Sequence, residues 1–252
     1  MVFALGLLLW VATVAVGRVT HNVILLPTIV LLGSFLVPIT AVVWYLDHDP
    51  SPALSPRRIV TAFLIGGVMG VLGASLLEYW LVRIGLIGAF EVGLIEEFVK
   101  AVFIVVVALG ISQFHIRDGM VLGATVGFGF AALESSGYAL ASLFVVQGNQ
   151  LILSLNSVIF TELVRGVLAP FGHGMWSAML GGAIFAAARR GGLRVTWVIL
   201  GTYLFVSALH GAFDSVTSIW GVAVVSLIGL IPFIWLWRRG DAGGVLKKRR
   251  PV

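Results

Sequence analysis

Long uninterrupted runs of apolar residues recur along the whole of this 252-residue chain, and they restrict its possible folds more than any other feature. A run of about eighteen or more such residues is long enough to cross the hydrocarbon core of a bilayer as a helix. A helix also pairs its own backbone groups, as the interior of a bilayer requires. The sequence therefore predicts an all-α fold, a polytopic transmembrane helical bundle with about eight spans.

Composition supports a membrane protein and limits what else the chain can contain. The chain is 60% hydrophobic and 11% charged, with a mean hydropathy of +1.09, whereas a soluble domain needs more charge to cover its surface. No hydrophilic stretch is long enough for a second domain, so we expect one membrane domain over residues 1–237 and a basic tail over residues 238–252. The absence of cysteine excludes disulfides, a thiolate nucleophile and cysteine metal ligands.

The apolar runs predict where the spans lie. The first run has no basic lead and no clear cleavage site, so we interpret it as a retained span and not as a removable signal. The stretch 148–171 is ambiguous, because it is apolar but carries Asn149, Asn156, Glu162 and Arg165. The expected spans are 2–17, 23–46, 59–82, 94–111, 118–147, 172–189, 194–215 and 217–237.

Basic residues predict the topology. If 148–171 does not cross, the main basic groups all fall on one side, which the positive-inside rule makes cytoplasmic. We therefore expect eight crossings of the cell membrane, both termini in the cytoplasm, and 148–171 as an outer or re-entrant segment. Arg18 and Arg83 fall on the other side and count against this topology. The main groups are Arg57, Arg58, Arg117, Arg189, Arg190, Arg194 and residues 247–250.

The same positions argue against nucleic-acid binding, because basic residues that flank apolar helices are topology signals. The lipid bilayer is the partner that we expect for them, and the basic tail could bind anionic lipid. A second pattern concerns packing alone. Gly119, Gly123 and Gly127 recur every four residues and should let another helix approach the fifth span closely.

Ionisable residues within the apolar spans need an explanation, because an aspartate at the centre of a membrane helix costs about 2.5 kcal/mol or more. Some could simply pair along one helix, as Glu96 with Lys100 and His210 with Asp214 are each four residues apart. Glu162 and Arg165 are interpreted as structural. The residues that remain as candidates for a site are Glu96, Glu97, Lys100, Glu134, His173, His210 and Asp214.

The predicted topology places these groups at a similar depth. Glu96 and Glu97 begin the fourth span near the outer face, and Glu134 lies about 24 Å along the fifth span, in its outer half. His173 and His210 lie at the outer ends of the sixth and seventh spans. Carboxylates and imidazoles gathered in a low-dielectric pocket can hold and deprotonate a water. The same nitrogen and oxygen ligands could hold zinc and leave a position for that water.

At these residues the chain resembles the PrsW family of intramembrane proteases. That family is marked by EExxK, then FxxxE, then two histidine motifs on later helices. The matching residues are Glu96, Glu97 and Lys100, then Phe130 and Glu134, then His173, and then His210 with Asp214. The resemblance covers roughly residues 40 to 220. The related CAAX prenyl protease superfamily usually has histidine at the place of Glu134, so the chain is more similar to PrsW.

The resemblance implies hydrolysis of a peptide bond within or beside the membrane. The substrate implied is a single-span membrane protein, such as an anti-sigma factor cut on its outer side. Glu96 or Glu97 would act as the general base on the attacking water. Glu134, His173 and His210 would hold that water or its metal, and the sequence leaves a zinc-assisted and a metal-free, glutamate-activated reaction both open.

Supporting roles follow for the remaining residues. Lys100 could keep a glutamate ionised by pairing with it, and Asp214 is expected to receive the second ring N–H of His210. The chain has no cysteine, and no serine stands out with a paired base, although Ser177 lies one helical turn from His173, so water is the expected nucleophile. Two other classes of function remain as alternatives: a transporter or ion pathway that uses the same charges, and a non-catalytic scaffold or immunity protein. No inverted repeat supports a transporter.

Overall fold

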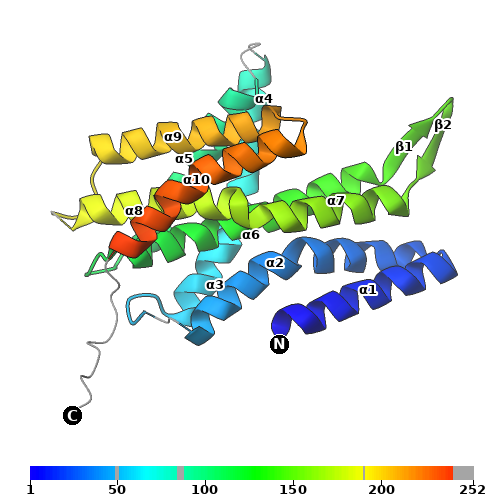
Figure 1. The fold of residues 1–252 in the computed structure, drawn as a ribbon, viewed down its shortest axis with the longest axis horizontal. Helices are drawn as coiled ribbons and strands as arrows, with labels where there is room; N and C mark the ends of the chain where they lie inside the picture. The colour runs from blue at the N-terminus through cyan, green and yellow to red at the C-terminus, as the bar shows by residue number, and fades with distance from the viewer. Residues whose placement is uncertain (49–50, 84–87, 190, 241–252) are drawn as a thin grey trace.

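The computed structural model describes residues 1–48, 51–83, 88–189 and 191–240, and nearly all of them are helical (Figure 1). The all-α prediction is confirmed for this part of the chain, apart from one hairpin. Short helical turns η1 (Val23–Leu25), η2 (Ile65–Met69) and η3 (Ala169–Phe171) adjoin longer helices. The longer helices are α1 (Val2–Thr20), α2 (Leu26–His48), α3 (Pro56–Leu64), α4 (Gly70–Arg83), α5 (Ala89–Ala108), α6 (Ile116–Ser142), α7 (Leu155–Leu168), α8 (His173–Ala188), α9 (Trp197–Ser215) and α10 (Ile219–Arg239).

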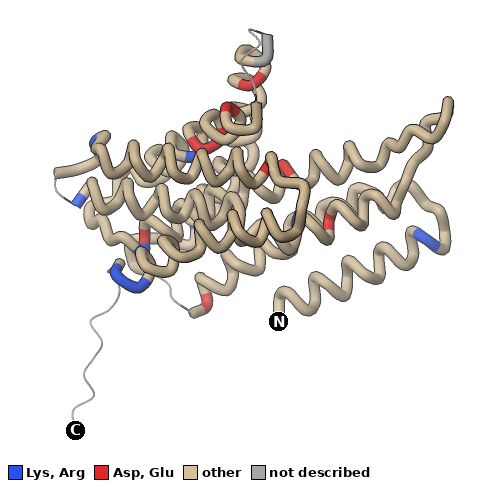
Figure 2. The backbone as a smooth tube through the Cα atoms, turned by 45° about the horizontal axis from the view of Figure 1, so that its top comes forward, with Lys and Arg blue, Asp and Glu red and all other residues tan. Residues whose placement is uncertain are grey.

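Six helical stretches in the described residues are long and apolar enough to cross a membrane. They are α1, η1 with α2, the continuous α3–η2–α4, α6, α9 and α10. The helices α5 and α8 match two further predicted spans, but α5 contains charged residues and α8 has 16 residues. Figure 2 shows that few of the residues along the chain are charged. Eight crossings stay a prediction, and the last twelve residues of the predicted tail lie outside the described part.

The region from 143 to 171 differs from the predicted extension of the fifth span to residue 147. Strands β1 (Phe144–Gln147) and β2 (Gln150–Leu153) form an antiparallel hairpin. A two-residue turn joins them, in which Gly148 has φ 59°, and glycine adopts this conformation readily. Helix α7 follows, and Figure 1 shows α7 and then α8 returning alongside α6. The stretch therefore forms a hairpin and the helix that leads into α8.

Three glycines of α6 allow α6 and α8 to pack with their backbones in contact, as the sequence predicted. A Cβ atom on any of them would lie closer than 3.0 Å to backbone atoms of α8, a separation that real side chains do not reach. The pairs in contact are Gly119 with Gly181, Gly123 with Ser177, and Gly127 with His173. Close glycine contacts of this kind are how helices approach one another in membranes. They fix the start of α8 against the middle of α6.

The main buried cluster lies between α2, α3, α5, α6 and α8 and includes Ile59, Ile104, Leu122 and Phe185. A second cluster joins α8, α9 and α10 through Trp176 and its neighbours. Helix α5 packs against α9, and α8 packs against α5, α6 and α9. The four helices α5, α6, α8 and α9 therefore face a common interior, and all of the candidate site residues lie on them.

Candidate active site

Helix α5 contributes two glutamates held by one lysine. Lys100 Nζ lies 3.2 Å from Glu96 Oε2 and 2.7 Å from Glu97 Oε1. The spacings of four and three residues place all three side chains on one face of the helix. The side chains of Glu97 and Lys100 are fully buried, where a charge is tolerated only with a partner. Lys100 Nζ also lies 4.2 Å from the centre of the Phe130 ring on α6, a favourable cation–π contact.

His210 on α9 meets these glutamates through both ring nitrogens. Its Nδ1 lies 3.0 Å from Glu97 Oε1, and its Nε2 lies 3.3 Å from Asp214 Oδ2 and 3.6 Å from Glu96 Oε2. When Nδ1–H donates to Glu97, the lone pair of Nε2 points to the side of Glu96 and Asp214. Asp214 is 42% exposed, whereas His210 is almost fully buried. Glu97 therefore sets the orientation of this ring.

His173 is the first residue of α8, and it too lies between two kinds of partner. Its Nε2 lies 3.0 Å from Glu134 Oε2 on α6. Its Nδ1 lies 2.7 Å from Lys100 Nζ and 3.8 Å from Glu96 Oε2. In the tautomer that fits these contacts, Nε2–H donates to Glu134 and Nδ1 accepts from the lysine ammonium. Glu134 therefore sets the orientation of the second ring.

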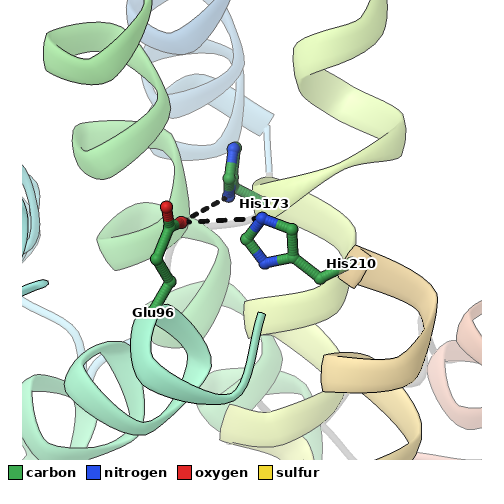
Figure 3. Close-up of side chains that lie close together, drawn as sticks. All are labelled: Glu96, His173 and His210. Carbon is green, nitrogen blue, oxygen red and sulfur yellow. Dashed lines mark ion pairs between the residues drawn. The ribbon is translucent and has the colours of Figure 1, made fainter. Parts of the chain in front are cut away.

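Both histidines consequently turn their other ring nitrogen toward Glu96 (Figure 3). One ligand atom from each of Glu96, His173 and His210 lies within 4.8 Å of the other two. A carboxylate on the opposite ring nitrogen is the usual support of a metal-binding histidine, because it fixes the tautomer and the ring orientation. Two imidazole nitrogens and a carboxylate oxygen form a donor set that zinc accepts. The residues present therefore fit a metal.

An aromatic ring packs against both histidines of this group. The buried Trp176 on α8 has its ring centre 4.7 Å from that of His210 and 5.6 Å from that of His173. A cavity of about 140 Å³ lies between α6, α7, η3, the start of α8 and the end of α9, and Trp176 lines it as well. Polar side chains that line it are Glu134, Ser135, Tyr138, Arg165, His173 and Asp214. The cavity is thus lined by one of the two histidines and by the carboxylates of Glu134 and Asp214, whereas Glu96 and His210 are not among its lining residues.

Arg165 joins the cavity from α7. Its Nη2 donates to Glu134 Oε2, and its Nε donates to Ser135 Oγ at 2.8 Å. Its guanidinium carbon lies 4.2 Å from the centre of the Tyr138 ring. One arginine is thus attached to three residues of the same face of α6, next to the carboxylate that orients His173.

The family model described as PrsW family intramembrane metalloprotease matches residues 55–237, which is most of the chain. The chain belongs to the PrsW family. Among curated relatives, a Protease PrsW of Halalkalibacterium halodurans is 26% identical over 71% of this chain and 78% of its own length. A Protease PrsW of Geobacillus kaustophilus is 24% identical over 73% of this chain and 78% of its own length. No solved structure matches the chain.

Membership of the PrsW family confirms the prediction of an intramembrane endopeptidase and an integral membrane protein. It also decides against the transporter and the non-catalytic scaffold as the function of the chain. The family is one of metalloproteases, which agrees with the donor set of Glu96, His173 and His210. The comparisons with known proteins do not assign a role to any single residue.

The structure of this PrsW-family chain brings together all of the residues that the sequence selected, but in a particular arrangement. Glu134 meets His173 at Nε2, the nitrogen that faces away from Glu96. The sequence interpretation expected Asp214 to receive the second ring N–H of His210. In the structure Glu97 lies at Nδ1, where it can receive that N–H, and Asp214 lies at Nε2. Glu134 and Glu97 thus flank the group, and Asp214 lies beside its ligand atoms.

Sequence reasoning did not predict the contacts of Arg165 with α6. The sequence interpretation grouped it with Glu162 as structural, but Glu162 Oε1 accepts a hydrogen bond from Ser34 Oγ on α2 at 2.8 Å, and Arg165 contacts α6. An arginine in an apolar segment needs an acidic partner, and here Glu134 on α6 supplies it. Ser177 gives no support to a serine nucleophile, because its Oγ is buried beside Gly127 and has no hydrogen-bond partner among the residues that the structure describes.

Proposed function

We propose that this chain hydrolyses a peptide bond of a membrane-anchored protein with a water activated between Glu96, His173 and His210, assisted by zinc. One observation carries the proposal. Each histidine has a carboxylate at one ring nitrogen and presents the other nitrogen to Glu96, at 3.8 Å for His173 and 3.6 Å for His210. Histidines that serve only to fill a core have no need of two separate carboxylate supports.

The geometry favours Glu96 Oε2, His173 Nδ1 and His210 Nε2 as the atoms that hold the metal. The sequence had suggested Glu134 in place of Glu96. In the proposed arrangement Glu134 and Glu97 instead orient the two rings by accepting their N–H groups. When bound, zinc supplies a Lewis acid that polarises the scissile carbonyl and activates a water.

Lys100 has a part in the same arrangement. Its ammonium contacts Glu96 Oε2 and His173 Nδ1, which are two of the three proposed ligand atoms. A metal at these atoms requires Lys100 to leave both of them and to keep its 2.7 Å contact with Glu97. The lysine then remains paired with the carboxylate that orients His210.

Asp214 is the carboxylate that we assign to proton transfer. Its Oδ2 lies 3.3 Å from His210 Nε2, and its side chain is 42% exposed and lines the cavity. Glu97, one of the two bases suggested by the sequence, is fully buried, and its Oε1 is engaged by Lys100 and His210. Asp214 would accept a proton from the attacking water and return it to the amine nitrogen as the C–N bond breaks. In a metal-free reaction, Glu96 would be the base.

The substrate proposed is a single-span membrane protein cut on its outer side, such as an anti-sigma factor. Two considerations support it. The resemblance to the PrsW family implies such a substrate, and the predicted topology, with both termini cytoplasmic in the cell membrane, places the cavity in the outer half of the bilayer. The cavity between α6, α7 and α9 has both apolar and charged lining residues, which suits a peptide that leaves a membrane helix.

The test measures cleavage of a single-span reporter and zinc content of the purified chain in lipid vesicles. Glu96→Gln should abolish both. Asp214→Asn should lower the cleavage rate by about 10²- to 10⁴-fold while zinc stays bound, as expected for loss of a general base. Glu91→Gln is the matched control on α5, because Glu91 accepts a hydrogen bond from the backbone of Gly88 at the start of that helix. Full cleavage by Glu96→Gln would refute the proposal.

A further inference from the structure

Arg165 is attached to α6 through contacts that fix its whole guanidinium plane. Nη2 donates to Glu134 Oε2, Nε donates to Ser135 Oγ, and the plane lies over the Tyr138 ring. A planar fork with several donors held in this way loses little further freedom, which is how arginine differs from lysine. A side chain held in this way can fix the position of the carboxylate that it contacts, which is that of Glu134.

The partner, Glu134, uses the same oxygen for two contacts. Oε2 accepts from Arg165 Nη2 and lies 3.0 Å from His173 Nε2. The order of the contacts is Arg165, Glu134, His173, and then Glu96 and Lys100 at the other ring nitrogen. Glu134 thus lies between Arg165 and His173, and its carboxylate connects the arginine to the histidine.

We propose that Arg165 is a positioning residue of the protease, which acts through Glu134 to keep the Nδ1 of His173 directed at Glu96 and His210. This rests on the metal site proposed above. Without the guanidinium, the Glu134 side chain loses its attachment to α7 and can turn away from His173 Nε2 in the cavity. The ring then loses the support that fixes its tautomer and its orientation.

The same helix offers a matched control. Glu162 lies one turn before Arg165 on α7, is buried, and accepts a hydrogen bond from Ser34 Oγ of α2 at 2.8 Å. Its hydrogen bond therefore anchors α7 to α2, whereas the hydrogen bonds of Arg165 run to α6. If α7 contributed to the site only by packing against it, a polar substitution at Glu162 would disturb the site as much as one at Arg165.

The experiment measures the zinc affinity of the full chain in detergent by competition with a chromophoric chelator. Arg165→Gln should weaken zinc binding about 10- to 100-fold, the usual effect of losing an outer support of a metal ligand. Arg165→Lys should recover part of the loss, because it keeps the charge without the fork. Glu162→Gln should bind zinc as the unmodified chain does, which separates the effect from a general disturbance of α7.

A double-mutant cycle tests the route. Arg165→Gln should cause no further loss of zinc affinity when Glu134 is already Gln, because the two residues act in series. Additive losses, or unchanged affinity in Arg165→Gln alone, would overturn the inference. His210→Ala separates the two proposals: if it binds zinc as tightly as the unmodified chain, the metal site itself fails and the inference fails with it. If His210→Ala loses zinc and Arg165→Gln does not, only the inference fails.

Discussion

Gly127→Ala perturbs the site without touching any of its side chains. The new Cβ would lie 2.8 Å from the carbonyl carbon of His173 and 2.8 Å from Ser177 Oγ, and closer still to the carbonyl oxygen of His173, whereas ordinary contacts begin at 3.4 Å. Both neighbours belong to α8, and one of them is backbone, which cannot rotate away. Helices α6 and α8 must therefore separate by about 0.6 Å or more at the level of His173.

The structure gives two magnitudes for this change. Forcing an extra methyl group into a packed interior costs about 1 to 3 kcal/mol of folding free energy. A displacement of about 1 Å in an active site can cost about 100-fold in rate, so a shift of about 0.6 Å in His173 should lower cleavage about tenfold or more. The loss of activity should exceed what the loss of stability alone explains, because His173 begins the helix that is displaced.

The control is on the same helix. Gly137 lies further along α6 and would have no atom within 4 Å of a new Cβ, so Gly137→Ala should gain about 0.5 to 1 kcal/mol from the better helix former. Thermal unfolding in detergent and the cleavage rate of a single-span reporter should be measured for both variants. Wild-type stability and rate in Gly127→Ala would refute the argument that backbone contact between α6 and α8 positions the site.

The other expected outcomes concern the metal and the topology. Glu96→Gln should remove zinc, whereas Glu134→Gln should weaken zinc binding about 10- to 100-fold; equal losses would return Glu134 to the ligand set. Chelation should stop cleavage and added zinc should restore it, and full cleavage by metal-free protein would favour Glu96 as the base of a metal-free reaction. Cysteines introduced at 53, 115 and 192 of this cysteine-free chain should all be labelled from the cytoplasmic side. Labelling of positions 53 and 192 from opposite sides would contradict eight crossings.

Much of the fold follows from the apolar runs alone, since each predicted span overlaps an observed helix. The hairpin was missed because Phe144–Gln147 is apolar enough to continue a span, and only the Gly148 turn separates it from β2. The glycine contacts between α6 and α8 were predictable, because a stripe of small residues has few other uses in a membrane helix.

It was harder to predict which atoms of the site are in contact than which residues belong to the site. Depth along the helices indicated that Glu134 and His173 meet, but no sequence pattern shows which ring nitrogen a carboxylate approaches. That choice depends on the side-chain torsions of His173 and on the neighbouring Lys100, which takes Nδ1. The partners of Arg165 and Glu162 were hard to predict for a related reason, because they come from other helices: α6 supplies Glu134 to Arg165, and α2 supplies Ser34 to Glu162.

The contacts of Lys100 within α5 have a consequence for biosynthesis. Translation delivers α5 to the membrane before α8 and α9 have been made, so Glu96 and Glu97 must enter the bilayer before either histidine exists. Each isolated charge would add about 2.5 to 3.5 kcal/mol to insertion at the centre of a helix. Lys100 lies within a turn of both glutamates, so α5 carries its own counter-ion through this step. When α8 and α9 arrive, their histidines meet carboxylates that are already ordered.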